Sequence, residues 1–180
     1  MKYEAQYDGS WYVELSSFER SMAWYRGSTM WLKSRLEGRK DRHPSLGMRN
    51  HIQGMLAEQA AAKALGIYWP MDIDTFHKPD LGHNIEVKMI GADWYGLRIY
   101  PWTPDDRRVV AVVLSSGGEQ GPYRIPGWYI AGEAKQHPEW VIAPNDRPPM
   151  WAVPQHELRL IETLYCEITT DRMYLEEKVP

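Results

Sequence analysis

Runs of apolar residues predict four strands in the middle of the chain. Residues 85–90 are mostly apolar and indicate a strand buried on at least one face, and residues 96–100 read as a second strand. The continuous apolar run over residues 109–114 is typical of a strand that is buried on both faces. Residues 123–130 predict an edge strand that bends at Pro126-Gly127.

Turn and cap residues near the N-terminus predict a hairpin followed by a helix. Asp8-Gly9 is a two-residue hairpin signal between residues 3–7 and residues 11–15. Ser16 is followed three residues later by Glu19, a pairing that caps helix starts. We therefore expect a helix from here to about residue 36, interrupted or bent near Gly27.

Two further helices complete the predicted elements. One is expected from Pro44 to Leu65, where Gly66 stops it, and a last one from Pro154 to about Tyr165, with the proline in its first turn. The order of hairpin, helices, strands and helix predicts an α/β or α+β fold with helices flanking a sheet. The 180 residues are expected to form one domain, with the hairpin and first helix in 1–45, the core in 46–135 and a helix and tail in 136–180.

The composition is that of a soluble globular protein, with 43% hydrophobic and 25% charged residues. No apolar run approaches the length of a membrane span, and the first residues do not begin a signal peptide. Cys166 is the only cysteine, which rules out a disulfide within the chain and fits a reducing cytoplasm. We expect a cytoplasmic protein with no membrane partner.

The most informative stretch, Pro79–Lys88, places an Asp, a Glu and a Lys around one turn. Glu86 and Lys88 lie two apart in a predicted strand and project the same way, while Val87 projects into the opposite apolar layer. The preceding Leu-Gly-His-Asn favours a chain reversal, which would return Glu86 to the neighbourhood of Asp80. Two converging carboxylates with a lysine beside them suit a hard cation such as Mg²⁺.

These residues resemble the PD-(D/E)XK nuclease superfamily, whose motif is carried here by Pro79-Asp80 and Glu86-Val87-Lys88. The resemblance covers roughly residues 46–135, and its later part, from Gly127, looks like nucleases of this type carried by bacteriophages. It implies a restriction-endonuclease-like fold, in which α-helices flank a central mixed β-sheet. It also implies that Asp80 and Glu86 are metal ligands and that Lys88 is the third catalytic member. One departure is the gap of only five residues between Asp80 and Glu86, which requires a tight hairpin.

The superfamily commonly places a Glu on a preceding helix, and Glu58 fits this position. In the predicted helix it shares a stripe with Met55, Ala62 and Leu65, so we expect it on or beside the packed face. A carboxylate there needs a partner, and a metal would supply one. Because polar neighbours blur the stripe, a half-exposed structural glutamate is the alternative.

Other interpretations of the motif residues stay open. The Glu86–Lys88 pair could be a same-face charge pair on an exposed strand. His77, Asp80 and His83 are spaced so that a turn could gather them around Zn²⁺, although no further ligand is clustered with them. His83 could instead contact a phosphate. A second Glu-x-Lys, at residues 133–135, has no upstream aspartate across a turn and predicts a helix start or a loop.

Charge and aromatic content suggest where nucleic acid would bind. The net charge of −3 argues against general coating of nucleic acid, but a DNA-processing enzyme needs only a local basic surface. Residues 33–49 supply one, unless they form only a solvated helix end and loop. The candidates for DNA binding are Arg35, Arg39, Lys40, Arg42 and Arg49, with His83 beside the motif. Arg107-Arg108 follows Asp105-Asp106 and is expected to be neutralised by it.

The chain has nine Trp and eleven Tyr against two Phe. Aromatic rings with a polar tip favour half-buried surfaces, and exposed ones stack on unpaired bases. Most of them are expected to complete the core. Those just past the motif strand, at Trp94, Tyr95 or Trp102, are the ones we expect to face a substrate.

These features together predict a Mg²⁺- or Mn²⁺-dependent nuclease that hydrolyses phosphodiester bonds in DNA. Asp80 and Glu86, with the Val87 carbonyl and Glu58, would hold one or two ions, and Lys88 would orient water or neutralise developing charge. The chain lacks the Gln-x-x-x-Tyr motif of RecB-like exonucleases, which favours an endonuclease. The expected setting is the cytoplasm of a bacterial or phage-infected host cell.

Two other functions stay open. The chief alternative is a non-catalytic nucleic-acid-binding or assembly protein that keeps the nuclease fold. The other is a metal-dependent hydrolase that acts on something other than nucleic acid. The sequence also leaves the oligomeric state open, including a homodimer.

Overall fold

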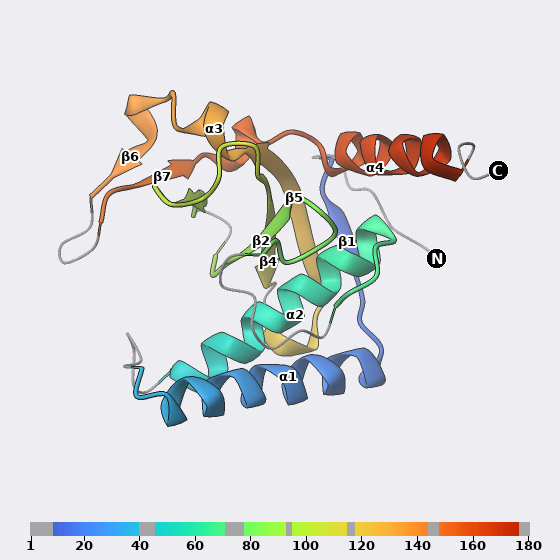
Figure 1. Cartoon of the computed structure of the whole chain (residues 1–180), viewed down its shortest axis with the longest axis vertical. Coiled ribbons are helices and arrows are strands. Elements are labelled where there is room, and N and C mark those ends of the chain that lie inside the picture. The colour runs from blue at the N-terminus through green and yellow to red at the C-terminus, as the bar shows by residue number, and fades with distance from the viewer. Residues whose placement is uncertain are drawn as a thin grey trace.

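The computed structural model describes residues 9–39, 46–70, 78–92, 95–114, 118–143 and 148–176, which form an α+β fold (Figure 1). The helices of this part are α1 (Ser17–Leu36), α2 (Gly47–Leu65), α3 (Ala131–Ala134) and α4 (Ile161–Glu176). The strands are β1 (Trp11–Val13), β2 (Ile85–Ile90), β3 (Leu97–Ile99), β4 (Arg108–Leu114), β5 (Tyr123–Ile130), β6 (Val141–Ile142) and β7 (Met150–Val153).

The central sheet has four strands in the order β1-β5-β4-β2. β2 and β4 are parallel, whereas β4 pairs antiparallel with β5 and β5 with β1. A second sheet, in the order β3-β7-β6, is antiparallel. The mixed central sheet agrees with the predicted fold class, and β2, which carries the motif, is its edge strand.

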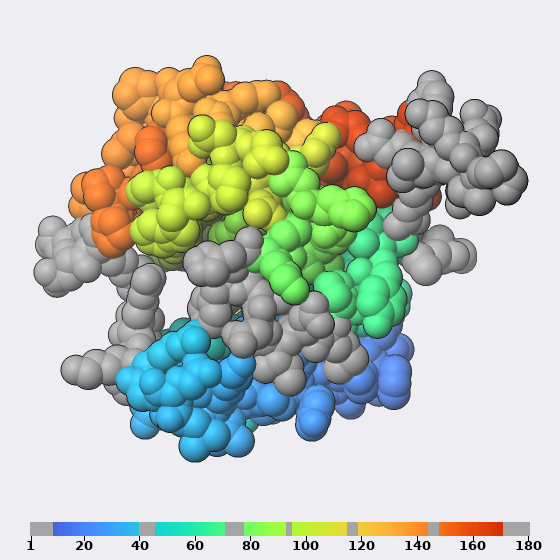
Figure 2. Space-filling view, in the orientation of Figure 1, coloured from blue at the N-terminus to red at the C-terminus, as the bar shows by residue number. Residues whose placement is uncertain are grey.

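The central sheet is buried on both faces, as the apolar run of β4 predicted. Val110 and Val112 pack into one core with α2, whereas Val109 and Val113 pack into another with β3 and β7. Side chains alternate faces along a strand, so a strand covered on both sides must be apolar throughout. In Figure 2, α1 lies on one side of the molecule and the region of β6 and β7 on the opposite side.

The two long helices begin and end largely where their signals predicted. Ser16 and Glu19 form a reciprocal capping box at the start of α1, and α2 ends at Leu65 with Gly66 as its cap. The expected interruption at Gly27 is wrong, because α1 is continuous through it. A Cβ at this position would lie 2.6 Å from the Cα of Ile52, so the glycine lets α1 and α2 approach closely.

Two predictions about later elements are wrong. β5 is an interior strand, and a register shift against β4 between Ala111 and Val113 accommodates the region of Pro126. The last helix runs from Ile161 to Glu176 rather than from Pro154 to about Tyr165. Pro154 begins only a 3-10 helix at Gln155–Glu157, because the backbone of Arg159 pairs with Trp128 of β5 through two hydrogen bonds of 3.0 Å.

The predicted N-terminal hairpin lies partly outside the described residues. Its first strand, residues 3–7, falls there entirely. Residues 11–13 of its second strand form β1, and this strand pairs with β5. Within the described helices, none is both long and apolar enough to cross a membrane.

Candidate functional site

A tight turn brings Asp80 next to the edge strand β2. Leu81 and Ile85 exchange backbone hydrogen bonds of 3.0 and 3.2 Å around it. Gly82 has a φ of 54°, a left-handed conformation that glycine adopts readily. One Asp80 carboxylate oxygen accepts a hydrogen bond of 2.8 Å from the backbone N–H of Val87. The short gap between Asp80 and Glu86 is therefore closed as predicted.

Over residues 85–89, strand β2 places its charged and apolar side chains on opposite faces, and Ile90 then joins the second core. Val87 is buried in the core beneath α2, as predicted. Glu86 and Lys88 lie on the other face and form an ion pair. The Nζ atom of Lys88 also lies 5.8 Å from the centre of the Tyr100 ring. The same-face pair that the sequence left open is thus present, at the edge of a pocket rather than on an open surface.

The α2 helix presents Glu58 from its packed side. Its carboxylate is buried, with 8% of the residue exposed. It accepts a hydrogen bond of 3.2 Å from the Trp69 indole and pairs at 3.5 Å with Arg26 of α1. Arg26 also donates a 2.6 Å hydrogen bond to the Pro70 carbonyl. The predicted position on the packed face is confirmed.

Burial of carboxylates, more than repulsion between them, determines the electrostatics of this region. Burial, together with the nearby Asp80 carboxylate, raises the pKa of Glu58 to about 8, because these effects outweigh those of Arg26 and Trp69. Burial, with a smaller effect of the Glu86 carboxylate, also raises the pKa of Asp80, against the opposing effects of the Val87 N–H, Lys88 and Arg107. Buried acidic groups whose charged forms are destabilised favour an additional cation beside them.

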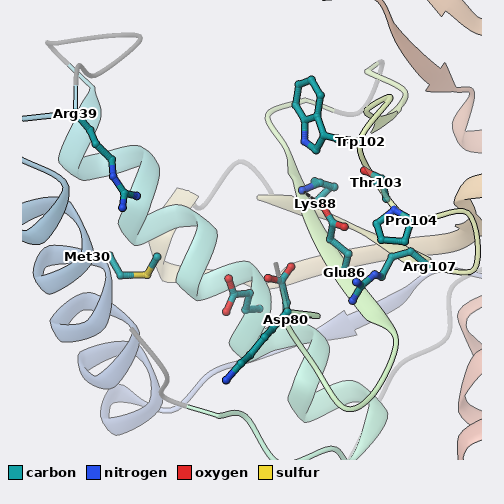
Figure 3. A pocket seen from close by; sticks show the side chains of 11 residues that line it. Met30, Arg39, Asp80, Glu86, Lys88, Trp102, Thr103, Pro104 and Arg107 are labelled. Atoms are coloured by element: carbon teal, nitrogen blue, oxygen red, sulfur yellow. Dashed lines mark ion pairs between the residues drawn. The ribbon is translucent and has the colours of Figure 1, made fainter. Parts of the chain in front are cut away.

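These residues meet in one pocket of about 820 Å³ (Figure 3). Glu58, Asp80, Glu86 and Lys88 all line it. In Figure 3, Met30 and Arg39 lie on one side of the pocket, and Lys88, Trp102 and Arg107 lie on the other. The structure therefore brings together the acidic and lysine residues that the motif predicted, although they come from α2, the turn and β2.

The carboxylates of the pocket are suitable ligands for a hard divalent ion, but they do not surround a single point as a complete set of ligands would. Carboxylate oxygens suit Mg²⁺, which usually keeps several waters and binds through one or two carboxylates plus substrate phosphates. Within the described ranges, no three His, Cys, Asp or Glu side chains are close enough together to hold an ion. Glu86 is instead paired with Lys88. His77 of the alternative zinc set lies outside the described residues.

The basic stretch is only partly brought to the site. Arg39 lines the pocket and pairs with Glu37 at 2.6 Å, whereas Arg49 pairs with Glu119 at 3.2 Å. Arg35 lies in the last turn of α1. His83 is exposed in the turn before β2. Lys40 and Arg42 lie outside the described residues.

The second Glu-x-Lys lies at a short helix, which agrees with its predicted place at a helix start or in a loop, and its side chains form local ion pairs. It lies in and just after the short helix α3. Glu133 pairs with Arg159, and Lys135 pairs with Asp105 at 2.7 Å. Lys135 also donates hydrogen bonds to the carbonyls of Pro101 and Thr103.

Sequence reasoning missed several residues of the pocket region, among them Lys78, which lines the pocket, and Arg26 and Trp69. Arg26 and Trp69 both contact the Glu58 carboxylate. In the sequence, Arg26 is marked only by its place next to Gly27, and Trp69 only by its place after the end of α2. Arg107 was expected to be neutralised by Asp105-Asp106, which is wrong. Asp105 pairs with Lys135 instead, while Arg107 lines the pocket.

Comparisons with known proteins add no relative. No family model, no curated protein and no solved structure matches the chain. The functional assignment therefore depends on the geometry of the pocket.

Proposed function

We propose that this protein is a divalent-metal-dependent nuclease that hydrolyses phosphodiester bonds of DNA, as an endonuclease. The observation that carries the proposal is the meeting of Asp80, Glu58, Glu86 and Lys88 in one open pocket. A buried cluster of acids with raised pKa values is costly to the fold, and such clusters are concentrated at functional sites.

Asp80 and Glu86, with the Val87 carbonyl and Glu58, would hold Mg²⁺ or Mn²⁺. A bound ion would polarise the scissile phosphate and lower the pKa of an attacking water. The hydrogen bond from the Val87 N–H fixes one Asp80 oxygen and leaves the other available as a ligand. Arg26 and Trp69 likewise contact one oxygen of the Glu58 carboxylate and leave the other available.

Lys88 would act on the substrate rather than on the ion. Its ammonium group lines the pocket on the same face of β2 as Glu86. A fixed positive charge there would orient the attacking water or stabilise negative charge that develops on the phosphate. The ion pair with Glu86 holds Lys88 in this position, and the same Glu86 carboxylate would be a ligand of a bound ion.

The test is a cleavage assay on plasmid, linear duplex, single-stranded DNA and RNA with Mg²⁺, with Mn²⁺ and with EDTA. Asp80→Asn should abolish metal-dependent cleavage. Glu133→Gln is a matched control, because it removes one carboxylate from the second Glu-x-Lys outside the pocket. Equal turnover by the wild type and Asp80→Asn would overturn the proposal.

A second candidate is a non-catalytic nucleic-acid-binding or assembly protein. The Glu86–Lys88 ion pair favours it, because a carboxylate held by a lysine is less available as a ligand. Within the described residues there is also no group of three metal-ligating side chains. Binding of DNA without cleavage in Mg²⁺ and in Mn²⁺ would select this candidate.

A further inference from the structure

Arg107 is a buried cation that points into the pocket without a partner for much of its guanidinium. Only 8% of the residue is exposed. Its Nε and Nη1 atoms are buried and have no hydrogen-bond partner among the described residues. Figure 3 shows the guanidinium directed towards Asp80 and Glu86. Native proteins rarely leave such donors unsatisfied, so an oxygen-rich ligand is the natural partner.

Trp102 offers a second kind of contact at the same pocket. Its ring stacks on Tyr100, with centroids 4.8 Å apart and planes 11° apart. This stacking covers one face of the indole, yet 60% of the residue is exposed. Trp102 also lines the pocket. A large aromatic surface therefore faces the solvent beside the acidic residues and Lys88.

The loop that carries Trp102 is held in place, which makes the ring a fixed platform. The Thr103 N–H donates to the Tyr100 carbonyl at 3.0 Å. Lys135 donates to the carbonyls of Pro101 at 3.2 Å and Thr103 at 2.5 Å, on either side of Trp102. A platform that is ordered before binding loses less conformational entropy when a ligand stacks on it.

We infer that the pocket binds an unpaired nucleotide, whose phosphate is held by Arg107 and whose base stacks on Trp102. This inference rests on the proposed nuclease function and gives it a substrate class, namely single-stranded nucleic acid or an unpaired strand within a duplex. A guanidinium binds phosphate oxygens through paired N–H groups. In a duplex, by contrast, each base is already stacked and paired, so it cannot lie on the indole without being unstacked.

The test measures binding of the full chain in EDTA, so that no cleavage occurs. The probes are a fluorescein-labelled thymidine oligonucleotide and a labelled duplex of the same length, read by anisotropy. Trp102→Ala should weaken single-strand binding by about tenfold, the loss of one base–aromatic stack, and leave duplex binding unchanged. Trp24→Ala, which removes an exposed tryptophan of α1 outside the pocket, should change neither.

Arg107→Met should also weaken single-strand binding and lower its log–log salt slope by about 0.7, the effect of one lost phosphate contact. Arg108→Met is the matched control, because Arg108 pairs with Glu167 and does not line this pocket. A structural arginine would destabilise the fold when replaced. Because Arg107 also favours the ionised form of the buried Asp80, the Tm alone does not separate a structural from a binding role. Weakened single-strand binding is the result expected of a ligand-binding arginine, and unchanged binding that of a structural one.

The outcomes separate this inference from the proposed nuclease function. Cleavage by the wild type, combined with equal binding of single strand and duplex that Trp102→Ala does not alter, would overturn the inference and leave the nuclease intact. Selective loss of single-strand binding in both pocket variants would support the inference even if no cleavage is found. A lowered Tm in Arg107→Met with unchanged binding would overturn the role of Arg107.

Discussion

Glu58 should make the stability of the metal-free protein fall as the pH rises, and Glu58→Gln should remove this dependence. The pKa of Glu58 is raised from an ordinary 4.5 to about 8. Between these two pH values the unfolded chain has lost the proton of this carboxyl, while the folded protein keeps it. Unfolding then releases a proton, so the free energy of unfolding decreases with rising pH.

The size of the effect follows from the shift. One pKa unit corresponds to about 1.4 kcal/mol, so the penalty at pH 7 is about 3 kcal/mol relative to pH 4.5. Glutamine resembles the protonated glutamic acid in shape and stays neutral. The variant should therefore match the wild type near pH 5 and exceed it at pH 7, by about 10 °C in Tm for a chain of this size.

The assay is thermal unfolding, with urea unfolding as a second measure, from pH 5 to pH 8.5 in EDTA. Glu133→Gln, on α3 and outside the pocket, should keep the pH dependence of the wild type. A Glu58→Gln protein that is less stable than the wild type by the same amount at every pH would refute the reasoning. That result would mean that the ion pair with Arg26 dominates over burial and over the Asp80 carboxylate.

The same measurement tests the metal site without any cleavage. Divalent ions bind the ionised carboxylates, so Mg²⁺ or Mn²⁺ should raise the Tm of the wild type more at pH 8 than at pH 5. Asp80→Asn should lose most of this gain because it removes a ligand charge. An equal shift in the wild type and in Asp80→Asn would place the bound ions elsewhere.

Three further outcomes are expected at the bench. Asp80→Asn and Glu86→Gln should each abolish metal-dependent cleavage with an unchanged circular dichroism spectrum, and undiminished turnover in either would remove that residue from the site. Lys88→Ala should still bind divalent ions in calorimetry yet lose cleavage by about two orders of magnitude or more, the scale of one preorganised charge; loss of metal binding would make Lys88 structural. Binding of duplex DNA should weaken, with a smaller salt slope, when Gln replaces four residues of the basic stretch, Arg35, Arg39, Lys40 and Arg42. An unchanged slope would mean that the DNA binds elsewhere on the protein.

The parts of the fold that could be predicted from sequence are those whose causes are local. The capping box at Ser16 and the turn after Asp80 depend on residues a few positions apart. The apolar run of β4 predicted a doubly buried strand because each face needs its own apolar residues. The motif itself belongs to this class, since one turn and one strand place Asp80, Glu86 and Lys88.

The wrong predictions have causes far away in the chain. Pro126 made residues 123–130 resemble an edge strand. In the structure β5 nevertheless has a strand on each side, because β1 pairs with one edge of it and β4 pairs with the other through a register shift. Pro154 satisfied the local signal for a helix start and does begin a short 3-10 helix at Gln155–Glu157, yet the pairing of Arg159 with Trp128 stops it from continuing into α4. Such pairings have no short-range signature.

The setting of Glu58 shows how a non-local contact determines the chemistry of the site. Its spacing on α2 predicted burial, but not that α1 would supply Arg26 as its partner. That partner comes close because Gly27, the next residue, has no side chain between α1 and the backbone of Ile52. The glycine that resembled a helix interruption therefore brings a guanidinium to the Glu58 carboxylate. The pKa of Glu58, and hence its readiness to bind a cation at neutral pH, depends on this helix contact as well as on Asp80.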